Sequence, residues 1–162
     1  MRNGRARRGS AAGEPRKNPG SEYHFPAGEA SQVRRAEDDG RTGVLTTEFT
    51  QGFAEDWIAA WNSHDLERIL SHYTDDFEMS SPVIVEFMGE PSGMLKGKVA
   101  VREYWSRALA RIPDLHFDLL EVFVGASSIV IHYRGPRGSS AEAFWFNDAG
   151  KVHRAAAHYV EG

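Results

Sequence analysis

Hydrophobic residues recur every three or four positions in three stretches of the chain, which is the spacing of amphipathic helices. The first stretch carries large aromatic residues four apart: Phe49, Phe53, Trp57 and Trp61. The second runs over 66–73, with apolar residues at i, i+3, i+4 and i+7, and the third over 98–111. Pro113 ends the third, because proline cannot continue a helix. The pattern therefore predicts three helices.

Alternating apolar and polar residues between turn sequences indicate strands in most of the remaining domain. We expect one strand from 77 to 85, around Pro82, and four more after Pro113. Glycine-containing turns separate these four, at 115–124, 127–134, 141–147 and 151–160. Three N-terminal helices followed by hairpins indicate an α+β fold. A strongly bent, mostly antiparallel sheet that wraps the helices would leave a cone-shaped hollow.

The first 43 residues differ from this pattern. They are rich in Gly, Pro, Ser, Arg and Glu, and their few large apolar residues show no period. A segment of this kind cannot bury enough apolar surface to offset the entropy lost on ordering. We therefore predict a disordered tail over 1–43 and one folded domain over 44–162.

The composition narrows the classes of function. The chain has 162 residues, a formal net charge of -4 and no cysteine, which excludes disulfides, thiolate metal sites and cysteine nucleophiles. The histidines lack metal-ligand spacing, and no phosphate- or dinucleotide-binding motif occurs, so we expect no metal and no cofactor. The acidic balance and the lack of a long apolar run favour neither nucleic acid nor membrane as partner. Absence of cysteine fits the cytoplasm, where we expect the protein.

The segment AWNSHDLERILSHYTDDFEMSSP, residues 60–82, resembles the N-terminal signature of the nuclear transport factor 2-like superfamily, in particular its SnoaL-like proteins. Three further motifs match in order and spacing: Leu95-Lys96-Gly97, Pro113-Asp114-Leu115 and Asn147-Asp148-Ala149-Gly150-Lys151-Val152. The resemblance covers nearly all of 46–160. It implies the cone fold of that superfamily, in which the first helix lines the hollow.

The resemblance also shows which chemistry is missing. Ketosteroid isomerases of this fold have a catalytic Asp before the proline that matches Pro82, and Ser81 stands there. Their two oxyanion-hole groups match Trp57 and Glu142, and a supporting Tyr matches Tyr73. SnoaL-like cyclases use an Asp on the last strand, where the sole carboxylate is Glu161 at the far end. Neither of these two chemistries is therefore expected.

Glu142 is the polar residue of greatest interest. It shares a strand face with Phe144 and Phe146, so one interpretation places its carboxyl among apolar groups, protonated or held by Tyr73 or Trp57. The other interpretation is a glutamate at a strand edge that reaches solvent. A turn at 135–138 would put Ile131 and Tyr133 on the same face as Glu142.

Two hypotheses about function follow. In the first, the hollow binds a small, largely apolar molecule, and Glu142 with Tyr73 as donor supports isomerisation, dehydration or hydration. The remaining residues expected to line the hollow are Trp57, Trp61, Ser81, Tyr104, Ala157 and Tyr159. In the second, the protein is a non-catalytic interaction module with a packed interior. Both hypotheses include a homodimer through the outer sheet face, formed by Ala141, Ala143, Trp145, Arg154, Ala156 and His158.

Overall fold

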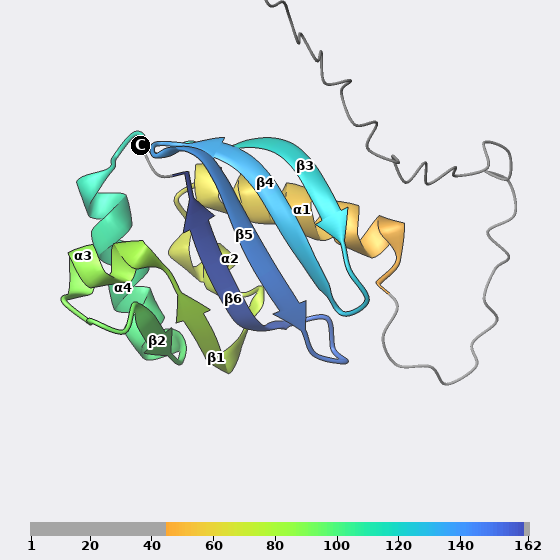
Figure 1. Ribbon diagram of the computed structural model, residues 1–162, viewed down its shortest axis with the longest axis horizontal. Coiled ribbons are helices and arrows are strands. Elements are labelled where there is room, and N and C mark those ends of the chain that lie inside the picture. Colours follow the sequence, from red (N-terminus) through yellow and green to blue (C-terminus); the bar gives the residue numbers. More distant parts are fainter. Residues whose placement is uncertain (1–44, 161–162) are drawn as a thin grey trace, which may run out of the picture. The chain divides into compact units, whose positions relative to one another are not determined.

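The computed structural model describes residues 45–160, so the predicted tail and Glu161 lie outside the described residues. The helices in this part of the chain are α1 (Thr47–Asn62), α2 (Leu66–Leu70), α3 (Pro82–Met88) and α4 (Lys98–Arg111). The strands are β1 (Tyr73–Ser80), β2 (Met94–Lys96), β3 (Asp118–Val124), β4 (Ser128–Gly135), β5 (Gly138–Phe146) and β6 (Val152–Tyr159) (Figure 1).

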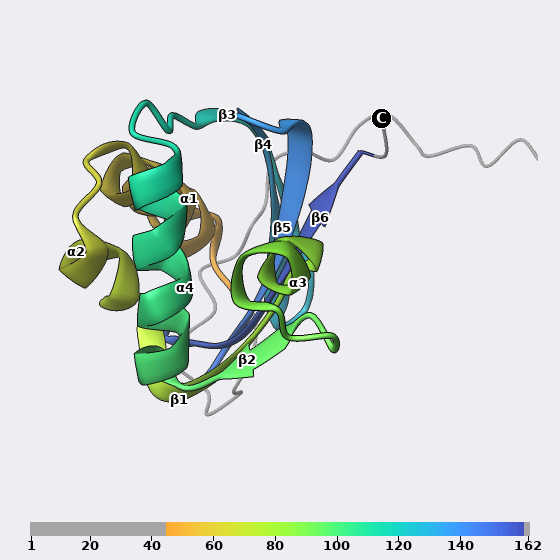
Figure 2. The same cartoon turned by 90° about the vertical axis from the view of Figure 1, so that its left-hand side faces the viewer.

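The strands form one sheet in the order β2-β1-β6-β5-β4-β3. All neighbours are antiparallel except β1 and β6, which run parallel. Figure 2 shows the sheet bending, with α1, α2 and α4 on one side of β3–β6. The expected α+β fold with a bent, mostly antiparallel sheet is confirmed.

Helix α1 supplies much of the core. The Thr46 hydroxyl caps its first turn by accepting from the backbone N–H of Phe49, at 3.1 Å, which satisfies a donor that the helix leaves free. Phe53, Trp57 and Trp61 are all buried. The aromatic stripe read from the sequence thus faces the sheet.

The strand expected around Pro82 is wrong beyond Ser80, because the chain forms helix α3 there. Val83, Ile84 and Val85 favour strands by their branched side chains, but the local capping chemistry prevails. The Ser81 hydroxyl accepts from the N–H of Val83 at 3.1 Å, and Pro82 occupies the first helical position, where its missing N–H costs nothing. Gly89 ends the helix in the left-handed region, at φ 69°.

The second predicted helix is too long at its C-terminus. Helix α2 ends at Leu70, and Tyr73 begins strand β1. The backbone N–H of Val152 donates to the carbonyl of His72 at 2.9 Å, where β1 and β6 begin to pair. Pairing with a strand eighty residues away therefore overrides the helical spacing of Tyr73.

Strand β3 begins at Asp118, three residues later than expected. The backbone before it is held by side chains from the end of α1 and from the α1–α2 connection instead of by a neighbouring strand. The Asn62 amide accepts from the N–H of Phe117 at 2.8 Å and donates to its carbonyl at 2.9 Å. His64 contacts the carbonyl of Leu115 at 2.7 Å. These bonds fix the backbone position of Phe117, whose side chain lines the site described below.

The register of β4 and β5 places the main polar residue of the site. Gly135 pairs with Gly138 across the turn, and Ile131 pairs with Glu142. Gly138 has φ +83°, a conformation that suits glycine in a tight hairpin turn. Because alternate residues share a face, Ile131, Tyr133 and Glu142 point inward and are buried. The register predicted from the turn sequence is confirmed.

Candidate functional site

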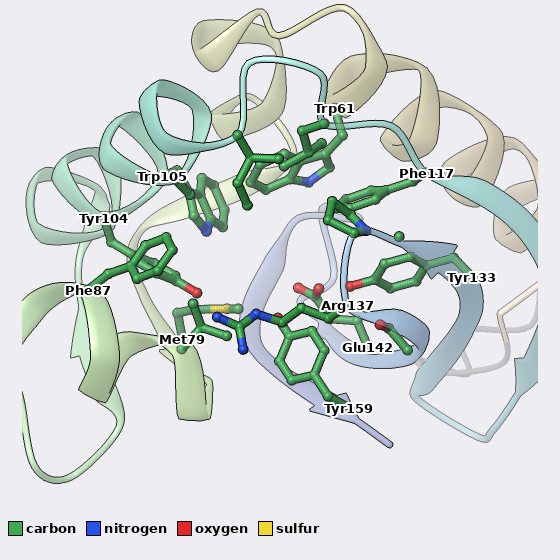
Figure 3. A pocket seen from close by; sticks show the side chains of 17 residues that line it. Trp61, Met79, Phe87, Tyr104, Trp105, Phe117, Tyr133, Arg137, Glu142 and Tyr159 are labelled. Carbon is green, nitrogen blue, oxygen red and sulfur yellow. The ribbon is translucent and has the colours of Figure 1, made fainter. Parts of the chain in front are cut away.

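A pocket lies between the inner face of the sheet and the helices, as Figure 3 shows. Its cavity volume is about 70 Å³, several times the roughly 10–15 Å³ that one water molecule needs. Aromatic rings from separate elements form most of its wall: Trp61, Phe87, Tyr104, Trp105, Phe117 and Tyr133. An enclosure of this kind, apolar with few polar groups, favours an apolar ligand.

The mouth of the pocket lies at the β4–β5 turn, because Pro136 and Arg137 are the exposed residues among those that line it. The Arg137 guanidinium forms an ion pair with Glu86 of α3. It also lies over the ring of Tyr159, 5.8 Å from the ring centroid. Arg137 therefore connects three elements around the opening.

Glu142 lies inside the pocket, on the inner face of β5 (Figure 3). It is only 5% exposed, so the interpretation of a glutamate reaching solvent is wrong. Its strand neighbours are Ile131 on one side and Ala157 on the other, and no hydrogen bond joins its carboxyl to another side chain within 45–160. Burial without a compensating charge raises the pKa of Glu142 to about 8. Most of this carboxyl is therefore protonated at neutral pH.

Four tyrosines lie close enough to Glu142 for its charge to act on their phenols: Tyr73, Tyr104, Tyr133 and Tyr159. Burial raises the pKa of each phenol above its ordinary value, and the negative charge of ionised Glu142 raises it further. All four remain neutral hydroxyls over the physiological range, able to donate as well as accept hydrogen bonds. The site thus combines one titratable acid with phenols that do not titrate.

Trp57 and Tyr73 pair with each other. The indole Nε1–H of Trp57 donates to the phenol oxygen of Tyr73 at 2.9 Å, and both side chains are fully buried. Neither lines the pocket. Of the two donors expected to hold the Glu142 carboxyl, the Trp57 indole is therefore bonded to Tyr73 instead. The catalytic role of Tyr73 stays a prediction.

Ser81 and Ala157 lie at a different place from the pocket. Both line a shallow groove on the surface beside α3. The Ser81 hydroxyl caps α3 and lies 3.4 Å from the phenol oxygen of Tyr104. Ser81 therefore does not line the pocket itself but contacts Tyr104, which does. Of the eight side chains expected to form the site, the pocket brings together Trp61, Tyr104, Glu142 and Tyr159.

Several lining residues were not found from the sequence, among them Met79, Phe87, Phe117 and Arg137. Phe87 belongs to the helix that was expected to be a strand, and Phe117 belongs to a segment expected to be regular strand. The alternation of residues in β4 correctly placed Tyr133 on the same face as Glu142, and this was the sequence feature that pointed to it. Arg137 lies in a turn, where side chains follow no helical or strand period that would predict the direction in which they point.

Residues 45–160 contain neither a membrane-spanning helix nor a metal-binding cluster of side chains. No helix there is both long and apolar enough to cross a membrane. No group of three or more His, Asp or Glu side chains in the same region is arranged to hold a metal ion.

Residues 54–158 match the model of the SnoaL-like domain family, and the chain belongs to this family. A SnoaL-like protein of unknown function from Burkholderia thailandensis is 51% identical. Its structure aligns with a TM-score of 0.70 over 73% of this chain and 99% of that one. No protein of curated function matches the sequence.

More distant structures share the fold alone. SalBIII, an epoxide hydrolase/cyclase-like enzyme that acts in pyran ring formation in salinomycin, is 15% identical, with a TM-score of 0.56. The alignment covers 70% of this chain and 92% of SalBIII. A candidate ketosteroid isomerase from Kribbella flavida is also 15% identical, with a TM-score of 0.56 over 71% and 80% of the two chains.

Proposed function

We propose that this SnoaL-like protein binds a small, largely apolar molecule in its pocket and acts on it by acid–base chemistry through Glu142. The carrying observation is a buried carboxyl group without a hydrogen-bond partner among the described side chains, set in a wall of aromatic rings. An unpaired polar group of this kind is costly to bury. Its presence in a pocket favours a role in function.

The raised pKa suits both halves of a proton transfer. A group with a pKa of about 8 is mostly protonated at pH 7, and a minor fraction is ionised. The protonated form donates to a carbonyl or hydroxyl oxygen of the ligand. The ionised form takes a proton from carbon beside a carbonyl and returns it to another carbon, which is an isomerisation without net change in protons. The same two forms serve dehydration or hydration.

Tyr104, Tyr133 and Tyr159 support this chemistry as neutral donors in the pocket wall. Negative charge that develops on a ligand oxygen is stabilised by fixed donors in a site with little water. The proposed reaction requires no metal and no cofactor. SalBIII, an epoxide hydrolase/cyclase-like enzyme, shares the fold, so the fold is compatible with catalysis.

Native mass spectrometry of freshly purified protein tests binding, and a retained small molecule is the expected result. Catalysis is tested with Glu142→Gln, which keeps shape and hydrogen bonding but removes the titration. On a substrate identified this way, the rate should fall by about 10²–10⁴-fold while affinity changes little. An unchanged rate would remove Glu142 from the mechanism, and an empty, solvent-filled pocket in every preparation would favour the alternative below.

The alternative is a homodimeric interaction module without catalysis. The observation in its favour is the outer sheet face, where Phe123 is 55% exposed and Ala143 and Trp145 are half-buried. The Arg154 guanidinium lies over the Trp145 ring, 4.8 Å from its centroid. A face with apolar area that no other element of residues 45–160 covers is suited to a second copy of the chain.

Sedimentation at micromolar concentration tests the homodimer, and Trp145→Glu should convert it to a monomer. A monomeric wild-type protein would contradict the dimer in both hypotheses. Because Glu142 and Trp145 lie on opposite faces of β5, the effects of the two variants are separable.

A further inference from the structure

Apart from tyrosines, two ionisable side chains line the pocket, and they lie at different depths. Glu142 is buried, whereas Arg137 is exposed at the mouth. Since burial keeps Glu142 mostly protonated at neutral pH, the lasting charge along the lining is the positive charge of Arg137. An anion that enters meets no fixed negative charge from the lining residues.

The Arg137 guanidinium is directed toward the site. Its charge acts on the phenols of Tyr104 and Tyr159, lowering their pKa values against the larger effect of burial. Figure 3 shows the side chain extending from the turn into the space between Tyr159, Met79 and Glu142. A guanidinium so placed presents its planar edge to whatever occupies the mouth.

A carboxylate already contacts this guanidinium. Glu86 of α3 accepts a hydrogen bond from Nη2 of Arg137, whereas Nε and Nη1 have no partner among the described side chains. The side chains of Arg137 and Glu86 are 41% and 54% exposed. Exposed ion pairs contribute little stability, so exchange of Glu86 for another carboxylate costs little. The contact shows that the geometry accepts a carboxylate.

We propose that Arg137 is a specificity-determining residue that binds a carboxylate group on the ligand, displacing Glu86, while the apolar body of the ligand enters the aromatic pocket. This proposal rests on the proposed function, because it requires a ligand in the pocket. It narrows the ligand class to small apolar carboxylic acids. It also orients the ligand, with its acid at the mouth and its apolar part facing Trp61, Trp105 and Glu142.

A matched pair of probes tests the proposal: phenylacetate and its neutral analogue phenylacetamide. Both carry the same ring and differ mainly in charge. Binding is followed by NMR shifts and by tryptophan fluorescence, which responds to the ligand because Trp61 and Trp105 line the pocket. At about pH 6.5 the probe acid is ionised and Glu142 is protonated. We expect phenylacetate to bind about tenfold more tightly than the amide.

Three variants locate the effect. Arg137→Gln should remove the preference for the acid, so that the affinities for acid and amide become about equal. Glu86→Gln should strengthen binding of the acid, because the competing carboxylate is gone. Arg134→Gln is the matched control, since it removes one positive charge from the same hairpin at a residue that does not line the pocket. It should leave the preference intact.

The outcomes separate this inference from the proposed function. Equal affinities for acid and amide in the wild type, with shifts at pocket residues, would overturn the role of Arg137 and leave the pocket as a binding site. An acid preference that survives Arg137→Gln, or disappears equally in Arg134→Gln, would overturn it as well. If neither probe binds, the inference falls, whereas the proposed function is still decided by the retained molecule in native mass spectrometry and by Glu142→Gln.

Discussion

Two carboxyl groups of this domain sit in opposite surroundings. Asp56, on the solvent side of α1, is bonded to Arg68 and to His72, at 2.7 Å from the latter. The hydrogen bond from Arg68, followed by the contacts with His72, lowers the pKa of Asp56. Glu142 has no such partner among the described side chains, and burial raises its pKa to about 8.

The difference separates structural from functional candidates. Asp56 stays ionised at neutral pH and ties α1 to the segment after α2, so its charge is used within the fold. The proton of Glu142 is exchangeable near neutral pH and its carboxyl faces a cavity. The carboxyl group of Asp56 therefore stabilises the fold, whereas that of Glu142 is available for proton transfer. The difference arises from the side chains around each carboxyl group.

The largest expected effect follows from the pH dependence of Glu142. Its pKa is higher in the folded than in the unfolded chain, so its contribution to stability is full below about pH 4.5 and is lost as the pH rises to about 8. Glu142→Gln has no such loss. The difference in melting temperature, variant minus wild type, should therefore increase by about 10 °C or more between pH 5 and pH 9.

Thermal denaturation at several pH values measures this difference. Asp56→Asn serves as the control carboxyl variant, since its effect should not grow between pH 5 and pH 9. A constant difference for Glu142→Gln would mean that Glu142 titrates as an ordinary, exposed glutamate.

A smaller effect is expected from Trp57→Phe. The phenyl ring retains most of the packing against Phe117 and Phe144, but the indole donor to Tyr73 is lost. Leaving a buried oxygen without its donor and a small void should cost about 2 kcal/mol. Urea denaturation measures the cost. A change below about 0.5 kcal/mol would show that water or another donor replaces the indole.

Asp56→Asn should have a weaker effect, about 1 kcal/mol or less, because the Asp56 side chain is 51% exposed and solvent screens its ion pairs. The lowered pKa sets the sign of the pH dependence. The contribution is present above the ordinary pKa of an aspartate and is lost as the pH falls through the lowered value. Urea denaturation at pH 7 and at pH 3 should show the variant's deficit shrinking in acid. A deficit that persists at pH 3 would contradict the ion-pair origin.

The smallest expected effect is that of deleting residues 1–43. The composition of this segment predicts no apolar contact with the domain, so calorimetry should give the same melting temperature for 44–162 as for the full chain. A decrease of several degrees would show that the segment packs on the domain.

Local patterns predicted the elements whose partners are close in sequence or whose burial is periodic. The aromatic stripe of α1 and the register of the β4–β5 hairpin were correct, because a four-residue spacing and a two-residue period each place side chains on one face. The strand expected through Val83–Val85 was wrong, because branched residues favour strands only weakly against a well-capped helix start at Ser81-Pro82.

Sequence alone determined that this chain contains an α+β domain of the SnoaL-like type, and that Glu142 shares a face with Phe144. Periodicity carries that information, since it follows from backbone geometry. Only the tertiary structure decided that Trp57 bonds Tyr73 instead of Glu142, and that Arg137 reaches the mouth and pairs with Glu86. Partners such as these are brought together by packing between elements far apart in the chain, and a polar side chain's charge state depends on which partner it finds.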